Sequence, residues 1–283
     1  MAEITGGEDF LAGMAASSRQ RVEAARAQLP EAELRARAAD SPLPPALQLS
    51  ARRFDVIAEV KFRSPAGGKL RDGSEDSVMA RVAGYAEAGA AAVSVLTEPS
   101  RFDGSMAHLA TAVRALGGSI PAMRKDFLVD PYQVYEARLA GAGGVLLILR
   151  MLDPAAIRAM IECAARLKLF VLLEAFDAAD IERAAELVKH YSSVASLLVG
   201  VNCRDLVSLE VVPGRLEELV RALPDTVPRV AESGVATAAD AGRIAIAGYD
   251  VALVGSALMA ALEPHQLVRA MISAGRTERA RRS

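Results

Sequence analysis

The sequence has few of the residues that bind metals or form disulfides. Only two cysteines occur among the 283 residues, Cys163 and Cys203, and they are far apart and form no Cys-x-x-Cys pair. This usage fits a reducing compartment and argues against a disulfide framework or a zinc site. The three histidines, His108, His190 and His265, are isolated from one another, so a metal centre built on them is not expected. We therefore expect a cytoplasmic protein without a metal site.

Long apolar segments and a charge excess of one sign are also missing. The longest apolar runs, such as Val145–Leu149, are much shorter than a membrane span, and the N-terminal residues lack the basic and apolar pattern of a secretory signal. Lys plus Arg number 33 and Asp plus Glu 35, which gives a net charge of −2. No partner among nucleic acids or membranes is therefore expected, and the arginines of the C-terminal "RTERARRS" stand without aromatic neighbours.

Apolar residues are plentiful enough for a large core. Hydrophobic residues make up 52% and charged residues 24% of the chain, which is typical of a globular protein. The length suits either two domains or one α/β barrel. The segment from Phe10 to Leu47 is rich in Ala, Glu and Arg and ends in "SPLPPAL", which predicts one or two helices followed by an extended connector.

From Asp55 onward, short β-type runs alternate with helical stretches. Each run is apolar at nearly every position, as expected of strands that helices cover on both faces of a parallel sheet. The eight runs lie at 56–60, 91–96, 119–123, 144–149, 169–174, 195–201, 228–233 and 250–255. Asp130–Pro131 and Asp153–Pro154 each place a capping side chain before a proline, which is a signal for a helix start.

Eight strand–helix units predict an α/β protein with a closed (β/α)8 TIM barrel over 54–275. We expect residues 1–53 to form an N-terminal helical extension packed on the barrel, and 276–283 to form a frayed tail. The alternative is a doubly wound open sheet. Its Gly-rich dinucleotide turn would follow the first strand, where this chain reads "EVKFRSPAGG", with charges in place of glycines.

Charged and polar residues follow the predicted strands, at the face where such barrels carry their active sites. They are Glu59, Lys61, Lys125, Asp126, Glu174, Asn202, Arg204, Glu232, Ser233, Gly255 and Ser256. Lysines and carboxylates that converge on one mouth shift each other's pKa values and become proton-transfer groups. The alternative is a set of loop salt bridges, which explains any single residue as well but explains a whole face poorly. Lys125 is therefore predicted to be a proton donor.

The loops after the last two strands carry a second signal. "SGVA" and "GSAL" offer small residues with free backbone N–H groups, in the loops that form the recurrent phosphate site of these barrels. We assign Gly234, Gly255 and Ser256 to phosphate binding. The alternative is that these glycines only permit tight turns.

Several segments together resemble a known family. "IAEVKFRSP", "VLTEPSRFDGS", "RKDFLVDPYQVYEARLAGAGGVLLIL", "GVNCRDL", "AESGV" and "ALVGSALM" occur in the order and spacing of the indole-3-glycerol phosphate synthase family of tryptophan biosynthesis. The resemblance runs from about Phe54 to Met259 and implies a lyase that uses no cofactor. It implies ring closure of 1-(2-carboxyphenylamino)-1-deoxyribulose 5-phosphate, with loss of carbon dioxide and water, to indole-3-glycerol phosphate.

The resemblance also implies roles for individual residues. Lys125 would protonate the carbonyl oxygen as general acid, and Glu174, with Lys61 or Glu59, would move the later dehydration protons. Lys61 would also neutralise the substrate carboxylate until carbon dioxide leaves. The remaining matched positions would bind substrate: Asn202 and Ser233 at hydroxyls, Arg204 at an anion, Phe102, Phe127, Leu146 and Leu206 around the aromatic ring, and Ser64, before Pro65, in the first loop.

The chain departs from the family pattern at Ala66–Gly67–Gly68, at Ala175–Phe176 and at Cys203. These departures keep the charged residues and leave open which ring substituents are accepted. Three alternatives therefore stand beside the main prediction: a divergent copy in secondary metabolism, another phosphate-binding barrel such as an isomerase, and a barrel that binds phosphate without catalysis. The sequence does not predict the oligomeric state.

Overall fold

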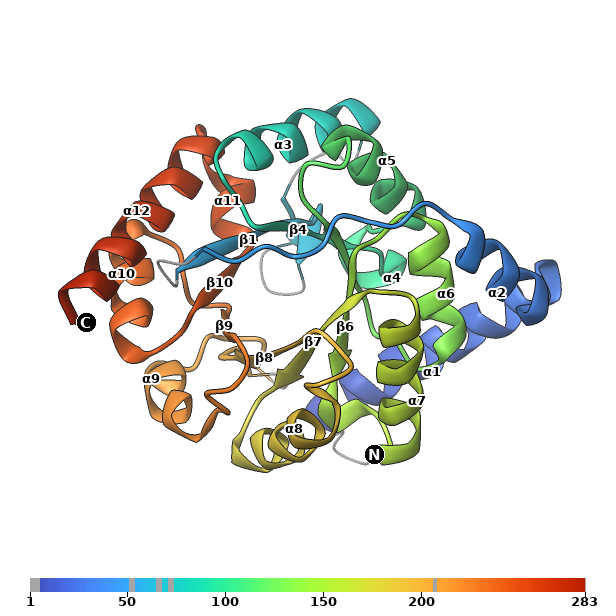
Figure 1. Ribbon diagram of the computed structural model, residues 1–283. Helices are drawn as coiled ribbons and strands as arrows, with labels where there is room; N and C mark the ends of the chain where they lie inside the picture. Colours follow the sequence, from blue (N-terminus) through green and yellow to red (C-terminus); the bar gives the residue numbers. More distant parts are fainter. Residues whose placement is uncertain (1–5, 51–53, 65–67, 71–73, 206–207, 283) are drawn as a thin grey trace, which may run out of the picture.

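The protein folds as a closed eight-stranded parallel barrel surrounded by helices (Figure 1). The computed structural model describes residues 6–50, 54–64, 68–70, 74–205 and 208–282. Around the barrel the strand order is β1-β10-β9-β8-β7-β6-β5-β4. The strands are β1 (Asp55–Val60), β4 (Ala92–Leu96), β5 (Ala122–Lys125), β6 (Gly144–Ile148), β7 (Phe170–Ala175), β8 (Leu197–Asn202), β9 (Arg229–Glu232) and β10 (Val251–Val254). The predicted (β/α)8 barrel is thus confirmed.

The helices lie on the outside of the barrel and connect consecutive strands (Figure 1). The longer ones are α3 (Glu75–Glu87), α5 (Met106–Leu116), α6 (Pro131–Leu139), α7 (Pro154–Arg166), α8 (Ala178–Tyr191), α10 (Ala238–Ala247) and α12 (Pro264–Arg282). The short elements are α4 (Pro99–Phe102), α9 (Arg215–Leu219), α11 (Ser256–Ala260), the 3-10 turns η1 (Leu149–Met151) and η2 (Val220–Ala222), and a hairpin of β2 (Arg63–Ser64) and β3 (Gly68–Lys69).

Each of the eight predicted strands is present, and only the third is displaced by more than two residues. The run at 119–123 predicted a strand that ends before Lys125, whereas β5 spans Ala122–Lys125. Pro121 has no N–H to donate to a neighbouring strand, so the ladder begins after it. As a result Lys125 is the last residue of the strand, and the rigid barrel wall fixes where its side chain points.

Side chains alternate between two cores, one inside the barrel and one between the barrel and its helices. Ile57, Met123 and Leu172 belong to the inner cluster, while their neighbours Val56 and Leu173 belong to the outer one. Successive strand residues point to opposite faces, so a strand buried on both sides is apolar throughout. This explains why the predicted runs showed no polar alternation.

The capping signals read from the sequence operate as expected. The Asp130 side chain accepts a hydrogen bond from the Tyr132 N–H, and Asp153 accepts from Ala155 and Ala156. In both helices a proline occupies the first turn. A backbone N–H at that position would have no carbonyl acceptor within the helix, so the proline costs no hydrogen bond. These caps start α6 and α7 close to the ends of β5 and β6.

The N-terminal segment forms α1 (Gly6–Gln28) and α2 (Glu31–Asp40), followed by an extended stretch, as predicted. The Arg21 guanidinium of α1 donates two hydrogen bonds to the Asp126 carboxylate beside β5, at 2.8 and 2.9 Å. Phe10 and Leu11 of the same helix reach the mouth of the barrel. The division of the chain into an extension over 1–53 and a barrel over 54–275 stays a prediction.

The C-terminal tail is part of the last helix. Residues 276–282 continue α12 and are helical, and the prediction that this tail frays stays a prediction. The arginines hold this helix to the barrel: Arg276 lies 2.6 Å from an Asp55 carboxylate oxygen, and Arg279 lies 2.9 Å from one of Asp250. Among the described helices, none combines the length and the apolar character that crossing a membrane requires.

Candidate active site

A cavity of about 320 Å³ opens at the carboxyl ends of the strands. Its lining contains most of the residues that the sequence singled out: Glu59, Lys61, Phe102, Lys125, Phe127, Leu146, Glu174, Asn202, Arg204, Ser233, Gly234 and Ser256. Of the other three, Gly255 is not part of the lining, Leu206 lies outside the described residues, and only the backbone of Ser64 is described, in β2. The prediction that charged residues converge on one mouth is thus confirmed, while their roles remain predictions.

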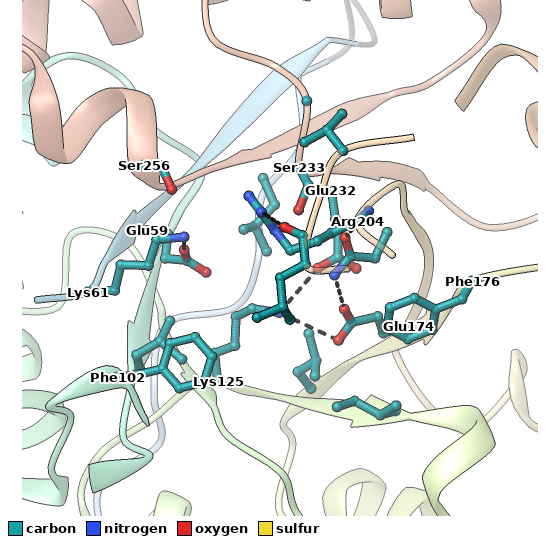
Figure 2. A pocket seen from close by; sticks show the side chains of 18 of the residues that line it. Glu59, Lys61, Phe102, Lys125, Glu174, Phe176, Arg204, Glu232, Ser233 and Ser256 are labelled. Carbon is teal, nitrogen blue, oxygen red and sulfur yellow. Dashed lines mark hydrogen bonds and ion pairs between the residues drawn. The ribbon is translucent and has the colours of Figure 1, made fainter. Parts of the chain in front are cut away.

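Four titratable side chains form the floor of this cavity (Figure 2). They are Glu59, Lys125, Glu174 and Glu232, from β1, β5, β7 and β9. These strands alternate around the barrel, and side chains from alternate strands of a TIM barrel meet in a common layer. Three carboxyl groups and one ammonium group therefore occupy a position where apolar side chains usually fill the barrel.

Lys125 bridges two of the carboxylates. Its Nζ lies 3.5 Å from Glu174 Oε2 and 3.3 Å from Glu232 Oε2. Burial disfavours the charged ammonium, but the negative charges of Glu174, Glu232 and Glu59 outweigh it, so the pKa of Lys125 is raised above its ordinary value. Lys125 thus stays protonated at neutral pH and is available as a proton donor.

For Glu232, the surroundings disfavour the charged form of the side chain. Its side chain is buried, Oε1 has no hydrogen-bond partner, and the charge of Glu174 lies close by. Burial and this like charge raise the pKa of Glu232 to about 8, although Lys125 acts in the other direction. The surroundings of Glu232 therefore favour its neutral form, which reduces the negative charge of the layer.

A second lysine stands at the edge of the layer. Lys61 Nζ lies 2.8 Å from Glu59 Oε1, while Glu59 Oε2 is buried and has no hydrogen-bond partner. This contact points the Lys61 ammonium into the cavity. In Figure 2, Lys61 and Glu59 lie at the left end of the charged layer and Glu174 lies at the right end. Two ammonium groups and three carboxyl groups thus face one space, as acid–base chemistry requires.

The end of β8 orients Glu174. The Asn202 side-chain amide donates to Glu174 Oε1 at 2.5 Å, and its own oxygen accepts from the Arg204 N–H at 3.0 Å. The Arg204 guanidinium donates to the carbonyl of Leu209 and lines the cavity. Asn202 therefore fixes one oxygen of Glu174 and leaves the other beside Lys125.

Aromatic side chains form an apolar wall on the other side of the cavity. The Phe102 and Phe127 rings lie 6.0 Å apart, and Phe10 of α1 meets Phe127 edge-on at 5.9 Å. Leu146 lines the same space. A slot of this kind suits a flat aromatic ring, since ligand sites are mainly apolar with few placed polar groups.

The loops after β9 and β10 supply small residues at the rim. Ser233 and Gly234 both have positive φ, at 65° and 71°, which turns their backbone back over the mouth. Ser256 begins α11 and lines the cavity. Gly255 lies behind them, and a Cβ there would stand only 2.1 Å from Glu59 Oε1. The missing side chain of Gly255 therefore makes room for the Glu59 carboxylate, and its predicted role in phosphate binding is a separate matter.

The two charged neighbours of Lys125 have a different role. Arg124 is buried and contacts Asp126, Glu136 and the carbonyl of Gln133. Asp126 accepts hydrogen bonds from Arg21, Thr97 and the Phe127 N–H as well. Although Asp126 borders the cavity, its carboxylate oxygens are already occupied. The expectation that Asp126 would belong to the proton-transfer set is therefore not supported by its contacts.

Several residues of the cavity were not predicted from the sequence. Glu232 was expected at a strand end but no role was predicted for it, although it meets Lys125 in the charged layer as Glu174 does. No site role was predicted for Phe10, Leu11, Ile148 and Phe176, which also line the cavity. Phe176 is held under the Arg150 guanidinium, 4.7 Å from its ring centre. These apolar residues carry no signal that distinguishes them from core residues.

Comparison with known proteins gives a consistent result. Residues 11–271 match the family model described as indole-3-glycerol phosphate synthase. A protein of that name from Micrococcus luteus is 41% identical over 268 residues, which cover 92% of this chain and 96% of that protein. Another, from Rhodococcus opacus, is 39% identical and covers 84% of this chain and 86% of its own length.

Solved structures resemble this one in fold alone. Thiamine phosphate pyrophosphorylase from Pyrococcus furiosus has a TM-score of 0.58 at 16% identity, over 81% of this chain and 99% of that one. 3-Hexulose-6-phosphate synthase from Salmonella typhimurium has a TM-score of 0.59 at 13% identity, over 79% and 99%. Within the described residues, no group of three or more His, Cys, Asp or Glu side chains is arranged to hold a metal ion.

Proposed function

This chain belongs to the indole-3-glycerol phosphate synthase family, and on that premise we propose how its barrel mouth carries out the reaction. The enzyme is a carboxy-lyase of tryptophan biosynthesis and acts on a phosphorylated small molecule. Its substrate, 1-(2-carboxyphenylamino)-1-deoxyribulose 5-phosphate, loses carbon dioxide and water and becomes indole-3-glycerol phosphate. The proposal concerns which residues bind this substrate and which transfer protons.

The substrate has an anion at each end and a ketone between them. We place its phosphate at Gly234, Gly255 and Ser256, where small residues and the start of α11 let backbone N–H groups approach an anion. The anthranilate ring then lies in the apolar slot of Phe102, Phe127 and Leu146, with Leu206 and Ser64 as further predicted contacts. This orientation brings the ketone over the charged layer on the cavity floor.

Lys125 donates the first proton. The ring carbon that bears the carboxylate attacks the ketone carbon and forms the new carbon–carbon bond. The carbonyl electron pair moves to its oxygen, and the Lys125 ammonium protonates that oxygen. The charge of Glu174 keeps the ammonium protonated, and the contacts with Glu174 and Glu232 aim it into the cavity, which supports this role. A placed general acid is typically worth about 10²–10⁴ in rate.

Loss of carbon dioxide follows. The bond between the ring carbon and the carboxylate breaks, and its electron pair restores the aromatic ring. Lys61 neutralises the carboxylate in the bound substrate, which lowers the cost of bringing an anion next to three carboxyl groups. Its 2.8 Å contact with Glu59 supports this placement, since the ammonium is already oriented before substrate arrives.

Dehydration completes the indole ring. The hydroxyl group leaves as water with a proton from Lys61, which Glu59 assists. Glu174 removes a proton from the neighbouring carbon, and the electron pair of that C–H bond forms the double bond of the product. Asn202 supports the assignment of Glu174 as base because it fixes one carboxylate oxygen and leaves the other free of amide donors. Asn202 and Ser233 also orient substrate hydroxyls, and Arg204 binds an anionic group.

Glu232 acts in its neutral form. A neutral carboxyl can donate a hydrogen bond to a substrate oxygen, and it adds no charge that would repel an anionic substrate. When the pH rises through the Glu232 pKa of about 8, the group ionises and both advantages disappear. Activity should therefore fall on the alkaline side as this carboxyl loses its proton.

The single observation that carries the proposal is the Lys125 ammonium between Glu174 and Glu232 on the floor of the cavity. Turnover of 1-(2-carboxyphenylamino)-1-deoxyribulose 5-phosphate tests it, followed by indole fluorescence and by release of carbon dioxide in the same reaction. We expect both products in equal amounts. Consumption of substrate with neither product would contradict the proposed reaction.

A further inference from the structure

Gly200 occupies the centre of β8, at the level of the charged layer. It pairs in register with Glu174 on β7 and with Val230 on β9. Its neighbours Val199 and Val201 point to the outer core, so a side chain at position 200 would point into the barrel. Glycine weakens a central strand, and where it persists it often marks a close approach of another group.

The backbone conformation at Gly200 does not explain the glycine. Residues with positive φ are a separate set, and Gly200 is not among them. Any residue can adopt its extended conformation. The reason must therefore lie in the space in front of its Cα atom.

That space is filled by Glu232. A Cβ atom at position 200 would lie 2.3 Å from Glu232 Oε1 and 3.1 Å from the Leu172 side chain. The first distance is far inside the van der Waals contact of carbon and oxygen, while the second is only tight. The Glu232 carboxyl therefore rests directly against the bare backbone of β8.

The position of one oxygen determines what the other can reach. With Oε1 against Gly200, Oε2 of Glu232 lies 3.3 Å from Lys125 Nζ. Oε1 itself has no hydrogen-bond partner there, so no hydrogen bond holds this oxygen in place. Lys125 holds Oε2, whereas only the shape of the wall limits where Oε1 can lie.

We propose that Gly200 is a positioning residue, whose missing side chain forms the seat that holds the Glu232 carboxyl beside Lys125. This inference rests on the proposed function, because it assumes that Glu232 takes part in the reaction. Gly200 itself touches no substrate. It acts through Glu232, and any residue with a Cβ atom at this position would shift the carboxyl from its place beside Lys125.

The first experiment replaces Gly200 with Ala. The added methyl group displaces the carboxyl by about 1 Å, and displacements of this size can cost about 10²-fold in rate. We expect kcat to fall about 10- to 100-fold and KM to change little, since the slot and the phosphate loops are intact. The alkaline limb of the pH profile should also move, which a loss of stability alone would not cause.

Gly144 on β6 offers a matched control. It too lies inside the barrel in a strand, and a Cβ there would meet the Phe170 ring at 2.4 Å. Gly144→Ala therefore makes a comparable clash in the same barrel, but with an apolar ring and away from the charged layer. We expect it to lower the thermal midpoint without moving the pH profile.

A double-mutant cycle with Glu232→Ala decides the matter. Without the Glu232 carboxyl, the added methyl group has nothing to displace. Gly200→Ala should therefore lower kcat less than about twofold in the Glu232→Ala background, compared with about 10-fold or more in the wild type. Additive losses, or an unchanged kcat in Gly200→Ala, would overturn the inference. Should Gly200→Ala alone fail to fold, folding of the double variant supports the seat, and failure of both overturns it.

The same cycle separates this inference from the function on which it rests. If Glu232→Ala retains the wild-type kcat, the proposed role of Glu232 is wrong and Gly200 has nothing to position. If Glu232→Ala is impaired while Gly200→Ala is not, the role of Glu232 stands and the seat is wrong. A crystal structure of Gly200→Ala would show directly whether Oε1 has moved.

Discussion

Three consecutive charged residues at the end of β5 lie in two very different environments. They are Arg124, Lys125 and Asp126. Arg124 and Asp126 lie in a network on the outer side of the strand that reaches α1. Lys125 points into the barrel and meets Glu174 and Glu232. Both groups are buried and both are held by ion pairs, so burial and pairing alone do not tell structure from catalysis.

The difference lies in how completely the hydrogen bonds of the carboxyl groups are satisfied. Arg21, Arg124, Thr97 and a backbone N–H all donate to Asp126. Although burial raises the pKa of a carboxyl, these donors lower that of Asp126 to about 2. In the inner layer, by contrast, Glu59 and Glu232 each keep a buried oxygen without a hydrogen bond.

A carboxylate with saturated hydrogen bonds favours one fixed protonation state, whereas a carboxyl group with an unpaired oxygen can exchange its proton. The outer network therefore stabilises the fold and joins α1 to the barrel. The inner layer is kept in an unfavourable state by the rest of the protein, as expected of an active site. The predictions below test this division.

The largest effect is expected from Lys125→Ala. Without the general acid, kcat should fall by at least about 10²-fold, measured by indole fluorescence at saturating substrate. Lys189→Ala, at an exposed lysine of α8, is the control and should keep wild-type activity. Unchanged turnover in Lys125→Ala would remove the distinction between the inner and outer groups.

Asp126→Asn tests the outer network. It leaves the Arg21 and Arg124 guanidinium groups without their shared carboxylate, and breaking a buried pair costs about 3–5 kcal/mol of unfolding free energy. Urea unfolding should show a loss of about 3 kcal/mol. In the wild type, the contribution of Asp126 is present above the unfolded pKa and is lost as the pH falls toward about 2.

Glu232→Gln tests whether the neutral carboxyl is the active form. The amide imitates the protonated acid, so kcat should fall less than in Glu232→Ala. The alkaline decline near pH 8 should disappear, because the group that titrates there is gone. A pH profile of kcat/KM measures both. A decline that persists unchanged in Glu232→Gln would assign it to another group.

The smallest effect is expected from Arg21→Lys. The lysine keeps the charge but not the paired hydrogen bonds to Asp126, so the unfolding free energy should fall by about 1 kcal/mol. Arg37→Lys is the control, since its pair with Glu33 is exposed and should be worth less than about 0.5 kcal/mol. Equal losses in both variants would mean that the outer network is no stronger than a surface ion pair.

Much of the fold was predictable because each strand is covered on both faces and leaves a continuous apolar run. The site was predictable in part, because charges after buried strands had to gather at one end of the barrel. Ser233, Asn202 and Arg204 were found in this way. What could not be predicted was the direction of each side chain: Asp126 and Lys125 are adjacent in sequence but face opposite environments.

The sequence also failed where a role depends on long-range packing. Nothing near Arg276 or Arg279 indicates that they meet acids at the starts of β1 and β10. Glu232 was noticed but not assigned, because its raised pKa comes from burial and from Glu174 on another strand. Such properties arise only when distant strands are brought together.

The most direct test of the account compares two changes of carboxylate to amide, Glu232→Gln inside the barrel and Asp126→Asn outside it. Thermal midpoints are measured at a pH of about 9, above the Glu232 pKa of about 8. At this pH Glu232 is ionised, and its buried charge destabilises the folded state. Glu232→Gln should therefore raise the midpoint, while Asp126→Asn should lower it. A lower midpoint in both variants would contradict the division between the satisfied Asp126 carboxylate and the unsatisfied carboxyl groups of the active site.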